Sequence, residues 1–256
     1  MAKFQGMKHP DYTLYLVTDE PAAYKKDFLA SIEAAVAGGA TVVQYRASGG
    51  TKRALYETGR ALRDLLRRLR APLIINDHVD LALALDADGV HVGQGDLPAV
   101  VVRRLVGKDK ILGLSVTNGG ELSAVDRRVV DYIGIGPVFP TRTKLDAAPA
   151  TGLDGLAALV ARATVPAVAI GGITLDNAPA VYATGVAGIA VVSALSRADD
   201  PRKAARALRG GTDRTDRTDR TDRTDRTDRT DQTDRTDRTL QHVQDLRAPE
   251  HFSEFS

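Results

Sequence analysis

Residues 41–75 read TVVQYRASGGTKRALYETGRALRDLLRRLRAPLII, and this stretch decides the fold class. It begins and ends with short apolar runs, Thr41 to Tyr45 and Leu73 to Ile75, that do not alternate with polar residues. Such runs are typical of strands buried on both faces of a parallel sheet. Between them, leucines recur at helical spacing and the arginines lie largely off the leucine stripe, which indicates an amphipathic helix. The stretch therefore predicts a strand, a helix and a second, parallel strand.

The same alternation continues in both directions along the chain. Apolar runs recur at Tyr12 to Val17, Thr41 to Tyr45, Leu73 to Ile75, Gly89 to Val92, Ile111 to Val116, Tyr132 to Ile135, Ala167 to Ile170 and Gly188 to Val192. Helical segments follow them at Tyr24 to Ala37, Thr51 to Leu69, Val79 to Leu85, Pro98 to Val106, Gly120 to Arg127, Leu153 to Arg162, Leu175 to Ala183 and Pro201 to Leu208. Eight strand-helix units in about 200 residues predict a small, single-domain α/β protein, a (β/α)8 TIM barrel. A doubly wound open sheet is the competing architecture, because length and periodicity do not report closure.

The end of the chain differs from the rest. From Thr212 to Arg238 it repeats the triplet Thr-Asp-Arg, with Gln232 in place of one arginine. The repeat has no apolar residue to bury, so we predict that it is disordered, with a charged tether as the alternative interpretation. We therefore divide the chain into an N-terminal extension at residues 1–11, a catalytic barrel at 12–210 and a low-complexity tail at 211–256.

Composition narrows the function classes. The tail holds 9 of the 35 basic and 12 of the 33 acidic residues, so residues 1–210 carry a net charge of +5 where the whole chain has +2. This mild charge suits small anionic substrates and no nucleic-acid surface. The absence of cysteine excludes disulfide frameworks and thiolate metal sites, and fits a reducing compartment. The longest apolar stretch, Val186 to Leu195, is too short to cross a bilayer, and Met1 to Asp11 has no apolar core of a signal peptide. We expect a cytoplasmic protein without a membrane partner, and a homo-oligomer is compatible with these features.

Polar residues and glycines follow almost every predicted strand. In a parallel barrel, catalytic groups come from the loops at the carboxyl ends of the strands. The groups found there are Gln44-Tyr45-Arg46, Asn76-Asp77, Gly93-Gln94-Gly95-Asp96, Ser115, Gly136 to Lys144, Gly171-Gly172 and Ser193. Several of these residues also have a plainer interpretation: Asn76 and Asp77 can cap a helix, and the glycines can form turns. His91, within the apolar run that precedes Gly93, can be a packed core residue. Their convergence on one rim favours an active site.

The rim residues divide into two chemical kinds. Arg46 and Lys144 are cations suited to an anion, whereas Asp77 and Asp96 are carboxylates that repel one. A divalent cation between the carboxylates and a phosphate reconciles them, and Mg²⁺ binds in this way. At the ends of the seventh and eighth strands, barrels commonly bind a phosphate on backbone N–H groups. These features predict displacement of diphosphate by a second substrate that carries a phosphate.

Residues from about Tyr12 to Leu208 resemble the thiamine-phosphate synthase family, also called thiamine-phosphate pyrophosphorylase. The resemblance depends on motifs that occur together and in this order. They are Leu14 to Asp19, Gln44-Tyr45-Arg46, Ile75-Asn76-Asp77, Gly89 to Asp96, Gly113-Leu114-Ser115, Gly136 to Lys144 and Ala169 to Ile173.

The resemblance implies a barrel enzyme that joins 4-amino-5-hydroxymethyl-2-methylpyrimidine diphosphate to a thiazole phosphate, giving thiamine phosphate and diphosphate. It implies that Asp77 and Asp96 bind Mg²⁺, and that Arg46, Ser115 and Lys144 are the catalytic residues. It further implies pyrimidine diphosphate contacts from Gln44, Arg46, Asn76, Ser115 and Lys144, and thiazole phosphate contacts from Thr141, Thr143, Gly172, Val192 and Ser193. The family's reaction is similar to a dissociative displacement, in which diphosphate leaves and the thiazole nitrogen captures a carbocation. All these residues lie between Gln44 and Ser193, so the tail contributes none.

The chain departs from the family pattern at two positions. The family usually has a lysine on the diphosphate two residues after the arginine, where this chain has Ser48. We hypothesise that Lys52 or Arg53 reaches back to replace that cation. The smaller departure is Gly95, where the family commonly has glutamate.

Two other functions compete with synthesis. A thiazole tautomerase relative shares the barrel but should lack the two carboxylates and carry a histidine where this chain has Thr117. A non-catalytic protein that binds the thiazole or pyrimidine phosphate is the second alternative, with Ser48 as the mark of lost activity. In addition, the long loop from Gly136 to Thr151 predicts a lid that closes over the substrates.

Overall fold

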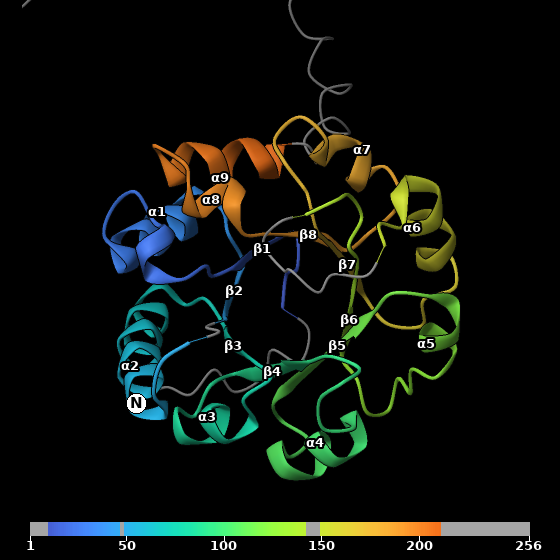
Figure 1. Ribbon diagram of the computed structural model, residues 1–256, viewed down its shortest axis with the longest axis horizontal. Helices are drawn as coiled ribbons and strands as arrows, with labels where there is room; N and C mark the ends of the chain where they lie inside the picture. Colours follow the sequence, from blue (N-terminus) through green and yellow to red (C-terminus); the bar gives the residue numbers. More distant parts are fainter. Residues whose placement is uncertain (1–9, 47–48, 142–148, 211–256) are drawn as a thin grey trace, which may run out of the picture. The chain divides into compact units, whose positions relative to one another are not determined.

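Parallel strands form a closed barrel in the computed structural model of the chain, which describes residues 10–46, 49–141 and 149–210. Each strand pairs with its neighbour in sequence, and β1 also pairs with β8, so the sheet closes on itself (Figure 1). The strands are β1 (Leu14–Val17), β2 (Val42–Tyr45), β3 (Leu73–Asn76), β4 (Gly89–Val92), β5 (Ile111–Val116), β6 (Tyr132–Ile135), β7 (Ala167–Ile170) and β8 (Gly188–Val191). Closure confirms the (β/α)8 barrel and excludes the open sheet.

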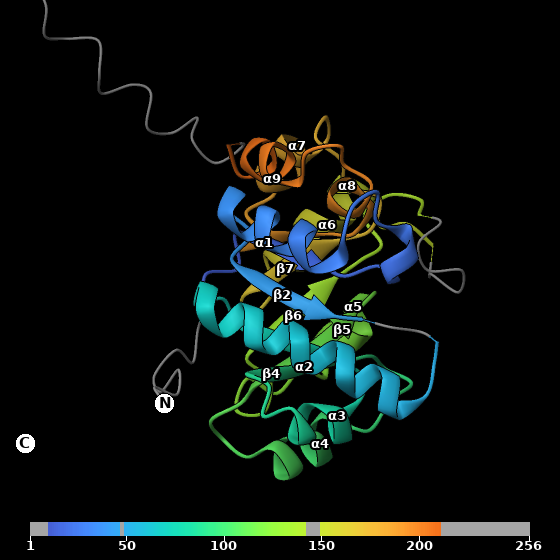
Figure 2. The same cartoon turned by 90° about the vertical axis from the view of Figure 1, so that its left-hand side faces the viewer.

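Helices cover the outside of the barrel as a ring (Figure 1). They are α1 (Phe28–Gly38), α2 (Lys52–Leu69), α3 (Val79–Ala84), α4 (Ala99–Val106), α5 (Gly119–Ser123), α6 (Gly152–Val160), α7 (Ala178–Tyr182), α8 (Ser193–Ser196) and α9 (Pro201–Arg209), with a 3-10 turn η1 (Pro21–Ala23). Helix α1 contacts both α2 and α9, and Figure 2 shows α2 running along the outer face. The described residues include no helix that is long and apolar enough to span a membrane.

Local capping explains where the first helices begin. The prediction of a helix from Tyr24 was wrong at its start, because residues 21–23 form η1 and α1 begins only after Asp27. The Asp27 carboxylate accepts a hydrogen bond from the backbone N–H of Ala30 at 2.8 Å, which satisfies one of the unpaired N–H groups of the first turn. Thr51 caps α2 in the same way through the N–H of Ala54.

The core has two layers that follow from strand alternation. One set of apolar side chains, such as Leu16 and Val43, packs between the barrel and the helices. The other set fills the inside of the barrel and includes Tyr12, Tyr15 and Tyr132. Successive strand residues point to opposite faces, so each strand supplies both layers. Large tyrosine rings in so small a barrel need empty positions beside them.

Gly113 supplies one of these positions. A Cβ atom at Gly113 would lie 2.3 Å from Nδ1 of His91 and 2.3 Å from Cζ of Tyr132. In the strand register, Gly113 pairs with His91 on one side and with Tyr132 on the other. The glycine therefore makes room for two rings from neighbouring strands.

We expect Gly113→Ala to destabilise the barrel by about 1–3 kcal/mol, because the added methyl group overpacks two rings that have no free space. The midpoint of thermal unfolding should fall by about 2–4 °C for each kcal/mol in a domain of this size. Gly49→Ala is the matched control, since nothing lies within 4 Å of its Cβ position. Equal unfolding midpoints for the two variants would show that the interior is not tightly packed at Gly113.

The predicted N-terminal extension and tail are tested only in part. Residues 1–9, and the whole of 211–256, lie outside the described residues, as do Ser48, Thr143 and Lys144. The prediction that the tail is disordered therefore stays a prediction, and so does the lid, whose residues 142–148 are not described.

Candidate active site

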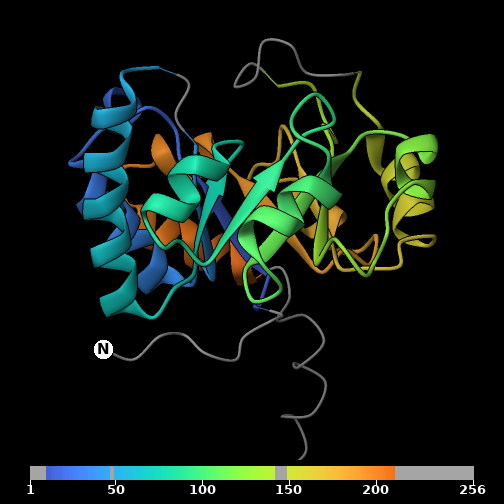
Figure 3. The ribbon, with the colours of Figure 1, turned by 90° about the horizontal axis from the view of Figure 1, so that it is seen from below.

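The carboxyl ends of the strands bring most of the predicted site residues to one rim. The strand arrows visible in Figure 3 point toward the same edge of the barrel, as in any all-parallel barrel. Gln44, Asn76 and Ser115 lie at or near the last positions of β2, β3 and β5. The register places Asn76 beside His91 of β4. Their arrangement is therefore set by strand pairing and not by flexible loops.

Thr18 fixes the backbone of Arg46 directly after β2. The N–H of Arg46 donates to Oγ1 of Thr18 at 3.0 Å, and the same hydroxyl donates to the carbonyl of Arg46 at 3.0 Å. Thr18 is 1% exposed and its own N–H donates to the carbonyl of Gln44. Because one buried threonine binds both polar groups of Arg46, the base of the arginine side chain has a fixed position on the rim. Thr18 lies in the Leu14 to Asp19 motif but was not among the predicted site residues, because its sequence position gives no sign of a contact with Arg46.

Asp77 has an unusual backbone conformation that turns it onto the rim. Its φ is +58°, in the left-handed region that few residues other than glycine, asparagine and aspartate adopt. The Asp77 N–H donates to the carbonyl of His91 at 2.8 Å, and Nδ2 of Asn76 donates to the Asp77 carboxylate at 2.6 Å. The N-cap position of α3 belongs to His78, whose side chain makes no capping hydrogen bond. The plainer interpretation of Asn76 or Asp77 as the cap residue is therefore wrong.

The loop after β4 carries the second carboxylate. One oxygen of Asp96 accepts a hydrogen bond from the N–H of Gly93 at 2.7 Å, which closes a tight turn. Nε2 of Gln94 donates to the carbonyl of Ser115 at 2.7 Å, tying the same turn to β5. Asp96 is exposed, and nothing lies within 4 Å of a Cβ added at Gly95. The turn therefore holds Asp96 at the surface of the rim.

These two carboxylates have the donor chemistry of a magnesium site that a substrate completes. The described part of the chain contains no group of three or more histidine, aspartate or glutamate side chains that could enclose a metal. Mg²⁺ does not require such a group, because it is usually held by one or two carboxylates together with waters and substrate phosphates. Asp77 and Asp96 follow adjacent, directly paired strands. The residues present therefore fit Mg²⁺ bound jointly with a diphosphate.

Lys52 lies at the start of α2 and contacts the segment that follows Asp77. Its Nζ is 3.0 Å from the Asp80 carboxylate and 3.1 Å from Nδ1 of His78. Desolvation acts to raise the pKa of Asp80, but the hydrogen bond and charge of Lys52, with the Leu81 N–H and His78, together lower it. Arg53 is exposed, and its side chain makes no hydrogen bond or ion pair among the residues that the structure describes. Of the two cations proposed to replace the one missing at Ser48, Lys52 is the one directed toward the rim at β3.

A buried network of polar side chains lies beneath the rim, inside the barrel. His91 is 8% exposed, as expected of a core histidine, but its two nitrogens contact Tyr132 and Ser115. Tyr132 also contacts Tyr15, which accepts a hydrogen bond from Gln44. The tyrosines did not figure among the predicted site residues. The available signal was the strand alternation, which puts His91 on the inward face with Gly89 and Gly93.

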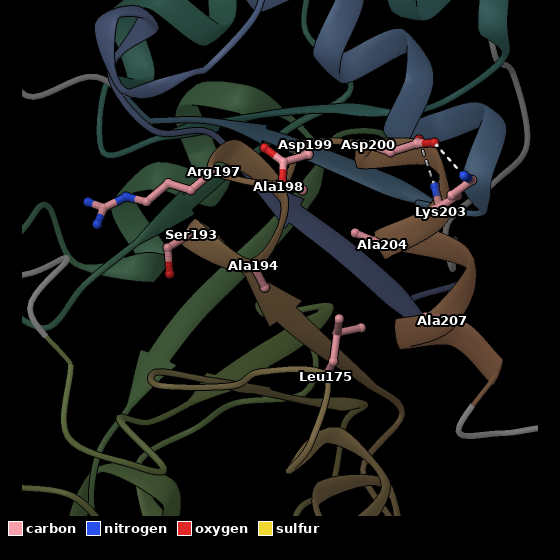
Figure 4. Close-up of a pocket in the computed structure, with 10 residues that line it drawn as sticks. All are labelled: Leu175, Ser193, Ala194, Arg197, Ala198, Asp199, Asp200, Lys203, Ala204 and Ala207. Atoms are coloured by element: carbon pink, nitrogen blue, oxygen red, sulfur yellow. Dashed lines mark hydrogen bonds and ion pairs between the residues drawn. The ribbon is translucent and has the colours of Figure 1, made fainter.

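The ends of β7 and β8 form the other side of the rim. Gly172 has a φ of +64°, and a Cβ there would lie 2.7 Å from Cβ of Phe139 in the loop after β6. Ser193 is exposed at the start of α8, directly after Val192. Beside it is an open hollow of about 440 Å³ between α8, α9 and Leu175 (Figure 4). Lys203 in this hollow pairs with Asp200, whereas Arg197 has no carboxylate partner among the described residues.

The structure thus groups most of the predicted residues and leaves a few undetermined. Thr141 is half-buried in the loop after β6, and Gly172, Val192 and Ser193 follow the next two strands. Thr143 and Lys144 lie outside the described residues, so the catalytic and binding roles given to Lys144 stay predictions.

Comparison with known proteins shows the family to which the chain is similar. Residues 14–195 match the family model described as thiamine monophosphate synthase. The chain is 52% identical over 195 residues to a thiamine-phosphate synthase of Chloroflexus aurantiacus, covering 76% of this chain and 90% of the relative. It is 50% identical over 195 residues to a thiamine-phosphate synthase of Desulfitobacterium hafniense strain Y51, with 76% and 94% covered. A solved structure of thiamine phosphate pyrophosphorylase from Pyrococcus furiosus is 40% identical with a TM-score of 0.71, covering 79% of this chain and 96% of that one.

Fold and rim together define a (β/α)8-barrel enzyme. More specifically, the chain belongs to the thiamine monophosphate synthase family. The resemblance that the motifs indicated is confirmed over most of the barrel.

Proposed function

We propose that the chain joins 4-amino-5-hydroxymethyl-2-methylpyrimidine diphosphate to a thiazole phosphate and releases thiamine phosphate and diphosphate. The observation that carries this proposal is the position of three residues in a barrel of this family: Arg46 follows β2, Asp77 follows β3 and Asp96 lies in the loop after β4. One cation and two carboxylates on neighbouring strands suit a diphosphate bound with Mg²⁺. The reaction is therefore a transfer of the pyrimidinylmethyl group, whose CH2 carbon exchanges its bond to diphosphate oxygen for a bond to thiazole nitrogen.

In this proposal the chain's own residues hold the diphosphate and stabilise its departure. Mg²⁺, held by Asp77 and Asp96, would supply positive charge as the carbon–oxygen bond breaks and the electron pair leaves with diphosphate. Arg46 adds a planar guanidinium that can bind two phosphate oxygens at once. Gln44, Asn76 and Ser115 orient the pyrimidine ring from the strand ends. Stabilisation of developing charge by such fixed groups is usually the largest contribution to the rate.

The second substrate binds on the opposite side of the rim in the same proposal. Backbone N–H groups near Gly172, Val192 and Ser193 receive the thiazole phosphate, as barrels commonly do after their last two strands. Thr141 and Thr143 complete this contact from the loop after β6. The thiazole nitrogen then forms the new carbon–nitrogen bond to the carbon atom that diphosphate has left. No proton donor or acceptor is required at the bond that forms.

A specific observation disfavours the tautomerase alternative. Thr117, at the position where we expect that relative to have a histidine, donates its hydroxyl to the Glu121 carboxylate at 2.9 Å. Its N–H donates to the same carboxylate at 2.6 Å. Thr117 therefore serves to begin α5 and offers no base for a tautomerisation.

An assay with both substrates, run with and without Mg²⁺, separates the alternatives. Formation of thiamine phosphate that depends on Mg²⁺ supports the proposal. Tautomerised thiazole phosphate without any thiamine phosphate identifies the tautomerase. Binding of either substrate without turnover identifies a non-catalytic binding protein, and both of these outcomes contradict the proposal.

We further propose that Lys52 supplies the cation that Ser48 does not. Lys52→Ala should lower kcat/KM for the pyrimidine diphosphate about tenfold, because one charge-assisted contact is lost. Its ion pair with Asp80 is exposed and contributes under about 1 kcal/mol to folding, so the variant should stay folded. Arg53→Ala, one residue along the same helix, is the control and should behave as the unchanged enzyme. Unchanged kinetics in both variants would eliminate this role for Lys52.

A further inference from the structure

Four hydrogen bonds join five side chains in a line across the inside of the barrel. They run from Nε2 of Gln44 to Tyr15 at 3.0 Å, from Tyr15 to Tyr132 at 2.8 Å, from Tyr132 to Nδ1 of His91 at 2.9 Å, and from Nε2 of His91 to Ser115 at 3.0 Å. We name this line the interior chain. Its two end members, Gln44 and Ser115, are both residues that we propose to contact the pyrimidine substrate, and its three middle members contact no proposed substrate atom.

The hydrogen bonds of the interior chain are buried, and the packing of the barrel holds its rings in place. Tyr15 and Tyr132 are each 1% exposed, Gln44 is 5% exposed and His91 is 8% exposed, so water does not compete for these bonds. Gly113 lies between the His91 and Tyr132 strands and leaves the space in which their rings meet. The ring of Tyr12 packs on Tyr132 with centroids 4.7 Å apart, and this supports the ring from below without joining the line of hydrogen bonds.

The direction of the hydrogen bonds in the interior chain follows from its first member and from the need of each buried hydroxyl proton for an acceptor. Burial raises the pKa of both Tyr15 and Tyr132, so each hydroxyl keeps its proton at neutral pH. The amide nitrogen of Gln44 can only donate, so the Tyr15 oxygen accepts that bond. Among the described residues, the Tyr132 oxygen is the one acceptor within reach of the buried Tyr15 proton, so that proton goes to Tyr132. Tyr132 in turn donates to Nδ1 of His91, which must be unprotonated there.

The bond between His91 and Ser115 has its direction fixed in the same way. With Nδ1 accepting, the neutral imidazole carries its proton on Nε2 and donates to Oγ of Ser115. A protonated Nε2 cannot accept the Ser115 proton, so that proton is left to donate to another partner. Ser115 is half-buried near the carboxyl end of β5, so that partner can be the substrate.

We propose that Tyr15 and Tyr132 are positioning residues that act through His91 to aim the Ser115 hydroxyl proton at the pyrimidine substrate. This inference rests on the proposed function, because that function makes Ser115 a substrate contact. The two tyrosines select one tautomer of His91, and the tautomer selects the donor role of Ser115. A Ser115 that donates binds an acceptor atom of the substrate, such as a ring nitrogen or a phosphate oxygen.

Two isosteric variants and one matched control test this role. Tyr132→Phe and Tyr15→Phe each remove one hydroxyl and keep the ring. Tyr12→Phe makes the same change in the same interior, at a hydroxyl that has no hydrogen-bond partner among the described residues. We expect Tyr132→Phe to lower kcat/KM for the pyrimidine diphosphate about tenfold, because a buried acceptor on His91 is left unpaired. Tyr12→Phe should leave it unchanged.

A spectroscopic readout separates positioning from loss of structure. ¹⁵N NMR of the full-length protein distinguishes protonated from unprotonated imidazole nitrogens, and the His91→Asn spectrum assigns the His91 signals. The unchanged protein and Tyr12→Phe should both show His91 protonated on Nε2 only. Tyr132→Phe should show a mixture of the two tautomers. Since this readout needs no substrate, it stands or fails apart from the proposed function.

A double variant completes the test. If Tyr15 and Tyr132 act through one line of hydrogen bonds, the double variant Tyr15→Phe/Tyr132→Phe should be as active as the less active of the two single variants. Multiplied losses would mean that the two hydroxyls act separately. A His91 protonated on Nδ1 in the unchanged protein, or a Tyr132→Phe variant with the same tautomer and the same kcat/KM, would overturn the proposal.

Discussion

Asp77→Asn is expected to lower kcat/KM for thiamine phosphate synthesis about a thousandfold, which corresponds to about 4 kcal/mol of transition-state stabilisation. The substitution removes one of two proposed carboxylate ligands and keeps the size of the side chain. Asparagine also adopts the left-handed backbone region as readily as aspartate, so the φ of +58° at this position does not strain the variant. The Mg²⁺ concentration needed for half of the maximal rate should rise in parallel, and a steady-state assay across a Mg²⁺ titration measures both quantities.

A carboxylate at the other end of the barrel controls for loss of charge alone. Asp109 is exposed just before β5 begins, so it lies at the amino ends of the strands, opposite the carboxyl rim. Asp109→Asn should leave both kcat/KM and the Mg²⁺ dependence unchanged. If Asp77→Asn keeps the Mg²⁺ dependence of the unchanged enzyme, Asp77 does not hold the metal and the proposed site is wrong.

Arg46→Ala is the second large effect, with an expected loss of about a hundredfold to a thousandfold in kcat. Arg46 is the proposed cation on the leaving diphosphate, and removing one preorganised donor from developing negative charge costs about this much in other enzymes. The variant should fold, because Thr18 binds the backbone groups of residue 46 and not its side chain.

Arg46→Lys tests whether the planar shape of the guanidinium matters in addition to its charge. It keeps the charge but loses the planar pair of donors that binds two phosphate oxygens, so we expect it to recover only part of the lost rate. Single-turnover measurements of thiamine phosphate formation would separate this loss from slower product release. Full activity in Arg46→Lys would mean that charge alone suffices, and full activity in Arg46→Ala would remove Arg46 from the mechanism.

Much of the fold could be predicted from the sequence because each element carries its own local signal. The apolar runs locate all the strands to within about two residues, and the helices between them follow from amphipathic spacing. Closure was predicted only from the number of strand-helix units and from the family resemblance, because pairing of β1 with β8 joins residues such as Tyr15 and Ala190 that no local pattern connects. The short helix α8 was missed, since Ser193–Ser196 is too short to show helical periodicity.

The rim residues of the site could be predicted from the sequence, and the residues of its interior could not. Asn76, Asp77 and Asp96 could be found because polar residues after apolar runs must lie at the carboxyl rim of a parallel barrel. The interior chain could not, because Tyr15 and Tyr132 are indistinguishable from core residues when considered singly. They are 117 positions apart in sequence, and only the closed barrel brings their hydroxyls to 2.8 Å. A role that depends on a contact between distant strands needs the strand register as well as the sequence.

The most direct test of the central claim is the stoichiometry of products released by the full-length protein. With both substrates and Mg²⁺ present, we predict that one thiamine phosphate appears for each diphosphate, and that neither product forms when either substrate is left out. Diphosphate released without thiamine phosphate, or substrates that stay unchanged in the presence of Mg²⁺, would contradict the proposed function.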